Sequence, residues 1–264
     1  MNATVFLGGG RITSALLAGL RLAEYDEPII VHDRNPKKLH DLRKSYGVAV
    51  ERNLQQAVAK ANLLIIAVRP GSVGSLLREI GRVDQPLAAV SLAAGVPLAK
   101  LRAALPHSVR WARAMPSPVC RNRRGLTAVT FDRNLPSASR RKITVLFSKV
   151  GQVLAIPESK FDAFTVTYSS SHGYHALSIL AAAAQKIGLD RKTALTAAAH
   201  ALADGIMSWR EADVSLDALV QEAVTPGGIA AAVMEAMNQA GFKRAIEKGL
   251  AAGLRRTRKN AKLA

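Results

Sequence analysis

A glycine-rich turn near the N-terminus carries the clearest chemical signal in the sequence. The stretch Leu-Gly-Gly-Gly-Arg-Ile-Thr follows a short apolar run and precedes apolar residues at helical spacing. Gly8 permits a tight turn, and Gly10 lets the backbone approach a phosphate with no Cβ between them. The amides at the helix start, near Arg11 and Ile12, can then hold the anion. Thr13 replaces the third glycine of the dinucleotide-binding fingerprint, which weakens the match but leaves the phosphate site, so the turn predicts a bound dinucleotide.

A charged cluster follows the second apolar run, at the position that contacts the adenosine ribose in such folds. An aspartate there accepts hydrogen bonds from the 2′-hydroxyl of NAD, whereas an arginine suits the 2′-phosphate of NADP. Asp33 and Arg34 are adjacent in this sequence, and Lys37 and Lys38 follow closely. Arg34 and its basic neighbours favour NADP over NAD, whereas Asp33 favours NAD if it points inward. The alternative for Arg34 and Lys37 is a solvated helix start with no role in binding.

The first half of the chain alternates strand and helix signals around these residues. The expected strands span 4–7, 29–31, 63–68, 87–92, 108–114, 127–131 and 152–156. The expected helices span 12–22, 36–46, 54–60, 73–80, 97–104 and 139–150. The third strand is apolar throughout, as in a parallel strand that is covered on both faces. This alternation predicts an α/β fold with βαβ units and a Rossmann-type doubly wound sheet.

The second half is predicted to be all helical, with no strand from Phe161 onward. Its expected helices span 176–188, 191–209, 216–224, 228–240 and 242–259. The pattern changes near Pro157, so we expect a dinucleotide-binding domain over 1–157 and an all-helical domain over 158–264. Small side chains and apolar faces favour an interface with a second copy of the chain, giving a homodimer or a larger homo-oligomer. The alternative is that these faces pack only within one chain.

Length and composition indicate a globular protein of one large or two ordinary domains. Hydrophobic residues make up 49% of the 264 residues, and charged residues make up 21%. The apolar runs fall short of the roughly 18 residues that span a bilayer, and the N-terminus begins with a strand-like run instead of a secretory signal. Cys120 is the only cysteine, which excludes an internal disulfide and a four-cysteine zinc site. We therefore expect a cytoplasmic, reduced protein with no membrane partner.

The charge of the chain is unusual. Thirty-seven Lys and Arg residues against 19 Asp and Glu residues give a formal net charge of +18 at pH 7. Such a field attracts anions, including nucleic acids and phosphorylated or carboxylated small molecules. A basic cluster occupies residues 255–262, where cations also suit the C-terminal end of a helix dipole. No nucleic-acid-binding motif accompanies the charge, so nucleic acid is not an expected partner.

Seven short segments give the sequence a resemblance to a known family. They are 6–20 (FLGGGRITSALLAGL), 67–70 (AVRP), 91–96 (SLAAGV), 113–119 (RAMPSPV), 125–129 (GLTAV), 161–165 (FDAFT) and 223–228 (AVTPGG). In order and spacing the chain resembles pyrroline-5-carboxylate reductase from about Val5 to Arg255. The resemblance implies a Rossmann domain followed by an all-helical dimerisation domain. It also implies hydride transfer from NADPH or NADH to the C=N carbon of a five-membered ring that carries a carboxylate.

The resemblance also implies binding residues. Cofactor contacts are implied for Ala67, Val68, Arg69 and Pro70, and for a group near the nicotinamide that comprises Ser91, Ala93, Ala94, Met115 and Pro116. A further turn is implied to hold the substrate carboxylate with its backbone amides, in the partner subunit's pocket, and it consists of Thr225, Pro226, Gly227 and Gly228. Without the resemblance, an ordinary helix-start turn explains these four residues equally well.

Three functional segments depart from the family pattern. Where the family has Ser-Gly-Ser-Gly-Pro-Ala-Tyr, residues 168–174 read Tyr-Ser-Ser-Ser-His-Gly-Tyr, which retains Ser170 and Tyr174. The family threonine after the Pro-Gly-Gly turn, a proposed proton donor, is replaced by Ala230. Where the family is mostly apolar or small, this chain has Arg121, Arg123 and Arg124.

These departures leave the chemistry open. In one interpretation the pocket still reduces 1-pyrroline-5-carboxylate, with Ser170 at the substrate and with His172, Tyr174 or a water supplying the proton. In another, the pocket suits a different imine or a keto substrate, and Arg121 or Arg123 meets a more acidic molecule. A third interpretation is a non-catalytic protein that binds NADP as a sensor. No metal site is expected, because His172 and His175 have no third ligand arranged with them.

Overall fold

The computed structural model describes residues 3–105 and 108–263, which form two compact units. The first unit contains the described residues up to Tyr168 and those from Ala252 onward. The second unit is Ser169–Ala251. The first unit therefore extends past residue 157, and it also includes the C-terminal end of the chain.

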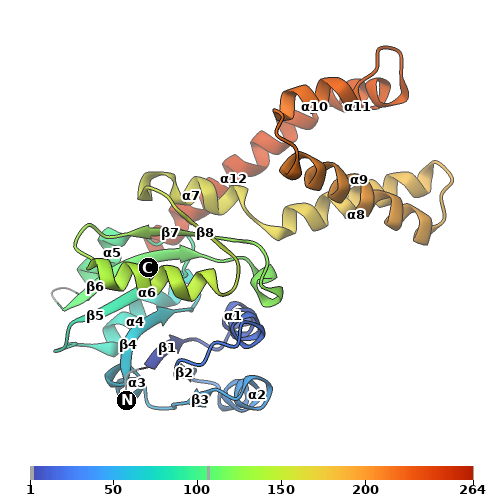
Figure 1. Cartoon of the computed structure of the whole chain (residues 1–264). Helices are drawn as coiled ribbons and strands as arrows, with labels where there is room; N and C mark the ends of the chain where they lie inside the picture. The colour runs from blue at the N-terminus through green and yellow to red at the C-terminus, as the bar shows by residue number, and fades with distance from the viewer. Residues whose placement is uncertain (1–2, 106–107, 264) are drawn as a thin grey trace. The chain divides into compact units, whose positions relative to one another are not determined.

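An eight-stranded sheet lies at the centre of the first unit (Figure 1). Its strands are β1 (Ala3–Leu7), β2 (Ile29–His32), β3 (Ala49–Val50), β4 (Ala61–Ile66), β5 (Leu87–Ser91), β6 (Val109–Met115), β7 (Leu126–Phe131) and β8 (Gln152–Ala155). Their order is β3-β2-β1-β4-β5-β6-β7-β8, and all neighbours are parallel except β6 and β7. The chain winds outward in opposite directions from β1 and β4, which makes their junction the switch point where open α/β sheets bind ligands.

Helices cover both faces of this sheet. The helices of the first unit are α1 (Arg11–Leu22), α2 (Pro36–Tyr46), α3 (Leu54–Ala59), α4 (Val73–Ile80), α5 (Leu98–Ala104), α6 (Ser137–Ser148) and α7 (Glu158–Thr167), with two 3₁₀ helices, η1 (Pro70–Ser72) and η2 (Pro118–Asn122). α1, α2 and α6 bury one face together with Ile65, and α3, α4 and α5 bury the other together with Ile66. Adjacent residues of β4 thus enter different cores, which explains why its sequence is apolar throughout.

The predicted doubly wound sheet is confirmed, and its predicted elements agree with the structure to within two residues at their ends. The strand β3 and the helix α7 were not predicted, and neither were the short 3₁₀ helices η1 and η2. β3 has only two residues. α7 lacked an amphipathic pattern because Glu158 and Asp162, four residues apart, both point to the buried Arg113 instead of to solvent.

The second unit is all helical, as predicted. It contains α8 (Ser170–Lys186), α9 (Arg191–Glu211), α10 (Leu216–Ala223), α11 (Ile229–Gln239) and the first part of α12 (Phe242–Leu263). α8 and α9 pack side by side (Figure 1). α8 begins six residues before its predicted start at 176, because Ser169 caps it by accepting a hydrogen bond from the Ser171 amide.

The last turns of α12 belong to the first unit and contact the loop that follows β5. Thr257 is buried there, and a Cβ at Gly95 would approach the Thr257 carbonyl oxygen to 2.5 Å. The Asn260 Nδ2 donates a hydrogen bond to the Ala94 carbonyl at 3.1 Å. The C-terminal end of the chain therefore fixes the backbone at the carboxyl edge of β5. Among the described residues, no helix is both long and apolar enough to cross a membrane.

Candidate dinucleotide site

The glycine turn connects β1 to α1 at the switch point of the sheet. Gly8 has φ +112°, and its amide donates to the His32 carbonyl at 2.8 Å. A Cβ at Gly8 would lie 2.6 Å from the Ala67 carbonyl oxygen, so the turn packs directly against the end of β4. At Gly10, by contrast, a Cβ would meet no protein atom within 4 Å. Gly8 is therefore needed by the fold, whereas Gly10 leaves the N-terminus of α1 open to a ligand.

Thr13 stabilises this turn through a hydrogen bond of its side chain. Its side chain is fully buried, and its hydroxyl donates to the Gly8 carbonyl at 2.5 Å. The hydroxyl thus ties the first turn of α1 to the glycine turn, at the position where the fingerprint has glycine for close packing. Thr13 departs from the fingerprint, and its side chain is nevertheless accommodated and hydrogen-bonded, which agrees with the expectation that the phosphate site is kept.

Asp33 follows β2 and points toward the glycine turn. Its carboxylate accepts hydrogen bonds from the Gly9 amide and the Asn35 amide, both at 2.8 Å, and lies 3.5 Å from the Lys38 ammonium. Burial raises the pKa of Asp33, but the hydrogen bonds from Asn35 and Gly9, with the charge of Lys38, outweigh this effect and hold the pKa below its usual value. Asp33 is therefore ionised and already engaged by the chain itself.

A cleft of about 790 Å³ opens over the carboxyl ends of β1, β2 and β4. Of the sequence-predicted cofactor residues, those that line it are Gly8, Gly10, Arg11, Ile12, Asp33, Arg34, Ala67, Val68 and Arg69. Its cationic side chains are Arg11, Arg34, Lys38, Arg69 and Arg121, and its acidic ones are Asp33, Asp41 and Glu79. The excess of positive charge, together with the N-terminus of α1, suits a polyanionic ligand.

Six predicted cofactor residues lie outside the lining of this cleft, namely Pro70, Ser91, Ala93, Ala94, Met115 and Pro116. Pro70 begins η1, Ala93 is buried with its amide donating to the Ser91 Oγ at 3.3 Å, and Met115 ends β6. Ala93 and Met115 nevertheless belong to the carboxyl ends of β5 and β6, on the same edge of the sheet as the cleft. Their contact with a nicotinamide stays a prediction.

Arg121 is a cleft residue that the sequence did not assign to the cofactor. One interpretation of the sequence has Arg121 meet a more acidic substrate, and that interpretation stays a prediction. In the structure Arg121 lines the dinucleotide cleft, from η2. The signal that could have placed it is Gly19, because a Cβ there would collide with the Cys120 carbonyl, which shows that η2 packs closely on α1.

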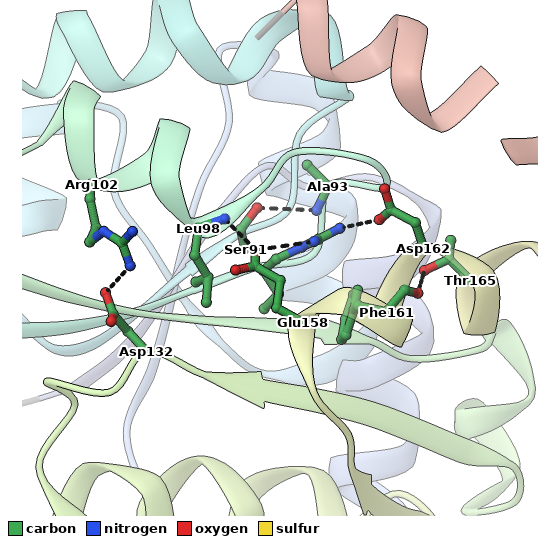
Figure 2. A network of polar contacts seen from close by, with 10 residues as sticks. Ser91, Ala93, Leu98, Arg102, Asp132, Glu158, Phe161, Asp162 and Thr165 are labelled. Atoms are coloured by element: carbon green, nitrogen blue, oxygen red, sulfur yellow. Dashed lines mark hydrogen bonds and ion pairs between the residues drawn. The ribbon is translucent and has the colours of Figure 1, made fainter. Parts of the chain in front are cut away.

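A buried ion-pair network lies beside the carboxyl ends of β5 and β6 (Figure 2). Arg113 is 2% exposed, and its guanidinium contacts Asp162 at 2.7 Å and Glu158 at 3.4 Å, with the Phe161 ring 4.4 Å away. The Glu158 carboxylate also accepts from the Leu98 amide at 2.6 Å. The network therefore joins β6, the start of α5 and α7 around the loop that contains Ala93.

The predicted catalytic and substrate residues belong to the second unit. Ser170, His172 and Tyr174 lie together in the first turns of α8, and Tyr174 is 65% exposed. The predicted carboxylate turn stands before α11, where Gly227 has φ +74° and the Gly228 amide donates to the Thr225 carbonyl at 2.9 Å. Pro226 lies within that turn. Among the described residues, no group of three His, Cys, Asp or Glu side chains could hold a metal ion.

The fold and the cleft define a Rossmann-type dinucleotide-binding protein with an added helical unit. A family described as "NADP oxidoreductase coenzyme F420-dependent" matches residues 4–95, and one described as "Pyrroline-5-carboxylate reductase dimerisation" matches residues 158–260. Pyrroline-5-carboxylate reductase of Synechocystis is 30% identical over 263 residues, covering 97% of both chains. That of Escherichia coli is 27% identical over 262 residues, also covering 97% of both. The chain belongs to the pyrroline-5-carboxylate reductase family.

Solved structures show the same fold. The Plasmodium falciparum pyrroline carboxylate reductase with NADP bound superposes with a TM-score of 0.87 at 19% identity, covering 98% of both chains. The Streptococcus pyogenes 1-pyrroline-5-carboxylate reductase gives a TM-score of 0.89 at 18% identity, covering 98% of this chain and 99% of that one. The predicted order of a Rossmann domain followed by a helical dimerisation domain is confirmed by these matches.

Proposed function

We propose that this chain reduces 1-pyrroline-5-carboxylate to proline, with NADPH as the reductant. The observation that carries the proposal is a cationic dinucleotide cleft at the switch point of the sheet, in a chain related to named pyrroline-5-carboxylate reductases over almost its full length. Bound NADPH supplies the hydride that adds to the C=N carbon. The protein's part is to hold the two reactants in register and to control the proton that reaches the ring nitrogen.

The residues of the cleft fit a dinucleotide. The backbone at Gly10 has room for a close approach, and the first amides of α1, at Arg11 and Ile12, face the region where a pyrophosphate would accept hydrogen bonds. Val68 and Arg69 come from the loop after β4 and supply apolar contact and positive charge. These features support the assignment of the cofactor site to the first unit.

The preference for NADP over NAD rests on the end of β2. The Asp33 carboxylate is engaged by two backbone amides and by Lys38, which reduces its repulsion of a nearby phosphate. Arg34 is exposed at the cleft and suits bidentate binding of a 2′-phosphate. Arg34 is thus assigned to the 2′-phosphate, and Asp33 to the support of the glycine turn.

The substrate side rests on the second unit. The turn Thr225–Gly228 precedes α11, whose first amides have no side-chain cap, and this arrangement supports binding of the substrate carboxylate. Ser170 is assigned to the substrate, and His172 or Tyr174 to proton delivery. A homodimer joins the second units of two copies, and the cytoplasm is the proposed location.

A coupled assay tests the proposal. The purified chain should oxidise NADPH when 1-pyrroline-5-carboxylate is supplied and should form proline in equal amount. Tyr174→Phe and His172→Asn should separate the two candidate donors, because loss of the donor lowers kcat by about 10²-fold or more while leaving the NADPH dissociation constant unchanged. His200→Asn, an exposed histidine on α9, is the control. Tight NADPH binding with no turnover of this substrate would contradict the proposal.

A second candidate is a reductase of the same chemistry with a different cyclic imine or a keto substrate. The observation that favours it is Ala230, which follows the Thr225–Gly228 turn in the first turn of α11 and cannot donate a proton. A panel of cyclic imines and keto acids, each with NADPH, would show this as a higher kcat/KM for another member of the panel than for 1-pyrroline-5-carboxylate.

A further inference from the structure

We propose that Arg121 is a pyrophosphate ligand of the bound dinucleotide and that it binds the phosphates shared by NADPH and NADH. This inference rests on the proposed cofactor site and adds a binding residue to it. It starts from the position of Arg121 in the lining of the same cleft as Gly10, Arg11 and Ile12.

The backbone that carries Arg121 is fixed against α1. The neighbouring Cys120 is 2% exposed, and its amide donates to the Ser117 carbonyl at 3.0 Å. Gly19 of α1 has no Cβ, and only this lets the Cys120 carbonyl pack on the helix. Because α1 also provides the phosphate-binding N-terminus, the turn that holds Arg121 and the amides of α1 are parts of one rigid arrangement.

The side chain of Arg121 is available for a ligand. Arg121 is exposed, and among the described residues it forms no hydrogen bond or ion pair within the chain. Arg123, two positions later, provides a contrast, because its Nε donates to the Lys149 carbonyl at 3.2 Å and it does not line the cleft. Of these two exposed arginines, Arg121 thus faces the cleft and Arg123 binds the backbone of a neighbouring loop.

The sheet order indicates which phosphate Arg121 reaches. The cations at the 2′-phosphate position, Arg34 and Lys38, follow β2, which lies on one side of β1. η2 follows β6, which lies on the other side of β1, beyond β4 and β5. Arg121 therefore approaches the N-terminus of α1 from the side opposite Arg34, where the pyrophosphate lies in a dinucleotide that spans the switch point. A guanidinium there can form charge-assisted hydrogen bonds to phosphate oxygens.

Equilibrium titration of the full-length protein with NADPH and with NADH tests this assignment. Arg121→Gln should weaken both cofactors by about tenfold or more, and by equal factors, because both carry the pyrophosphate. Arg121→Lys should recover part of the lost cofactor affinity. Raised salt should reduce the difference in cofactor affinity between the wild type and Arg121→Gln. Arg34→Gln should weaken the binding of NADPH but not that of NADH. Arg123→Gln should leave the affinity for both cofactors unchanged. The thermal midpoint of Arg121→Gln should equal that of wild type, since the side chain is exposed and has no ion-pair or hydrogen-bond partner among residues 3–105 and 108–263.

Two results would overturn the inference while leaving the cofactor site in place. One is unchanged affinity of Arg121→Gln for both cofactors in a protein whose wild type binds NADPH. The other is a loss confined to NADPH, which would move Arg121 to the 2′-phosphate. If the wild type binds neither NADPH nor NADH, the proposed function fails first and the inference fails with it.

Discussion

The first unit buries its apolar surface within one chain, whereas the second unit leaves much of its own exposed. In the first unit, both faces of the sheet are covered, and Leu63, Leu64 and Ile65 are fully buried. In the second unit, Ile187 and Ile229 are 85% and 87% exposed, and three residues of α11 at four-residue spacing, Ile229, Val233 and Met237, are all exposed. A fold whose apolar helix faces have no cover in its own chain needs a second copy.

The same contrast holds for the chemistry. Most of the predicted cofactor residues of the first unit line one cleft, beside a glycine turn whose backbone is held by the Thr13 hydroxyl on the Gly8 carbonyl. The predicted substrate residues of the second unit stand at the starts of two helices, α8 and α11, and are mostly exposed. The first unit thus brings most of its predicted cofactor residues together within a single chain, whereas the predicted substrate residues of the second unit lie on a unit whose family description is a dimerisation domain.

The largest expected effects come from alanine substitutions at Gly8 and Gly10, which should differ in thermal stability. Gly8→Ala should lower the thermal midpoint by several degrees and abolish NADPH binding, because Gly8 has a positive φ and an added Cβ would lie 2.6 Å from the Ala67 carbonyl oxygen. Gly10→Ala should keep the wild-type midpoint and still weaken NADPH at least tenfold, because its Cβ would meet the ligand and not the protein. Thermal unfolding and cofactor titration measure both. Wild-type affinity in Gly10→Ala would show that the pyrophosphate lies elsewhere.

The next effect concerns the apolar stripe on α11. The double substitution Val233→Asp with Met237→Asp should convert the oligomer to a monomer, because two charges would have to be buried at the interface. Turnover of 1-pyrroline-5-carboxylate should fall by about 10²-fold or more if the partner completes the substrate pocket. Sedimentation velocity measures the assembly. The control, Ser137→Asp with Ala138→Asp, adds the same charge at exposed positions of α6 in the first unit and should leave the assembly intact.

A smaller effect is expected in the network of Figure 2. Asp162→Ala removes the 2.7 Å partner of the buried Arg113 and should lower the free energy of unfolding by about 2 kcal/mol, since Glu158 remains as a second partner. Chemical unfolding measures the change. Asp26→Ala changes an exposed aspartate of the first unit that forms no ion pair among the described residues, and it should lower the free energy of unfolding by less than about 0.5 kcal/mol. An equal decrease in the free energy of unfolding for the two variants would show that the ion pairs of Arg113 do not stabilise the fold.

The smallest effect is a pH dependence at Asp33. Its pKa is lowered in the folded protein, so its contribution to stability is complete above the usual aspartate pKa and is lost as the pH falls through the folded value. Asp33→Asn should therefore show a shallower loss of stability than wild type as the pH is lowered below about 4. Urea unfolding at a series of acidic pH values measures this slope. Parallel curves for the two proteins would mean that the Gly9 and Asn35 amides do not stabilise the carboxylate.

The sequence predicted the fold well because the strongest signals were local. The apolar run in β4, the Pro36 start and Gly47 end of α2, and the glycine turn each depend on neighbouring residues only. α7 was missed because its polar residues serve Arg113, which lies some fifty positions earlier in the chain. The return of α12 to the first unit was also missed, since nothing near Thr257 in sequence indicates that Gly95 leaves space for it.

The site was predicted in part for the same reason. Gly8, Gly10 and the end of β2 form a local motif, and all line the cleft. The contacts of Thr13 and Arg121 were not predicted, because they depend on a hydrogen bond to Gly8 and on the packing of η2 against α1, which residues distant in the sequence determine. The substrate residues stay predictions, because their pocket depends on how copies of the chain assemble.

We propose that the first unit binds the cofactor without a partner copy, whereas catalysis needs the second units of assembled copies. Titration of NADPH against the Val233→Asp, Met237→Asp protein, with turnover measured on the same sample, tests it most directly. We expect the NADPH dissociation constant of this variant to stay within about threefold of the wild-type value while turnover is lost. Loss of NADPH binding together with the loss of assembly, in a protein whose first unit remains folded, would contradict it.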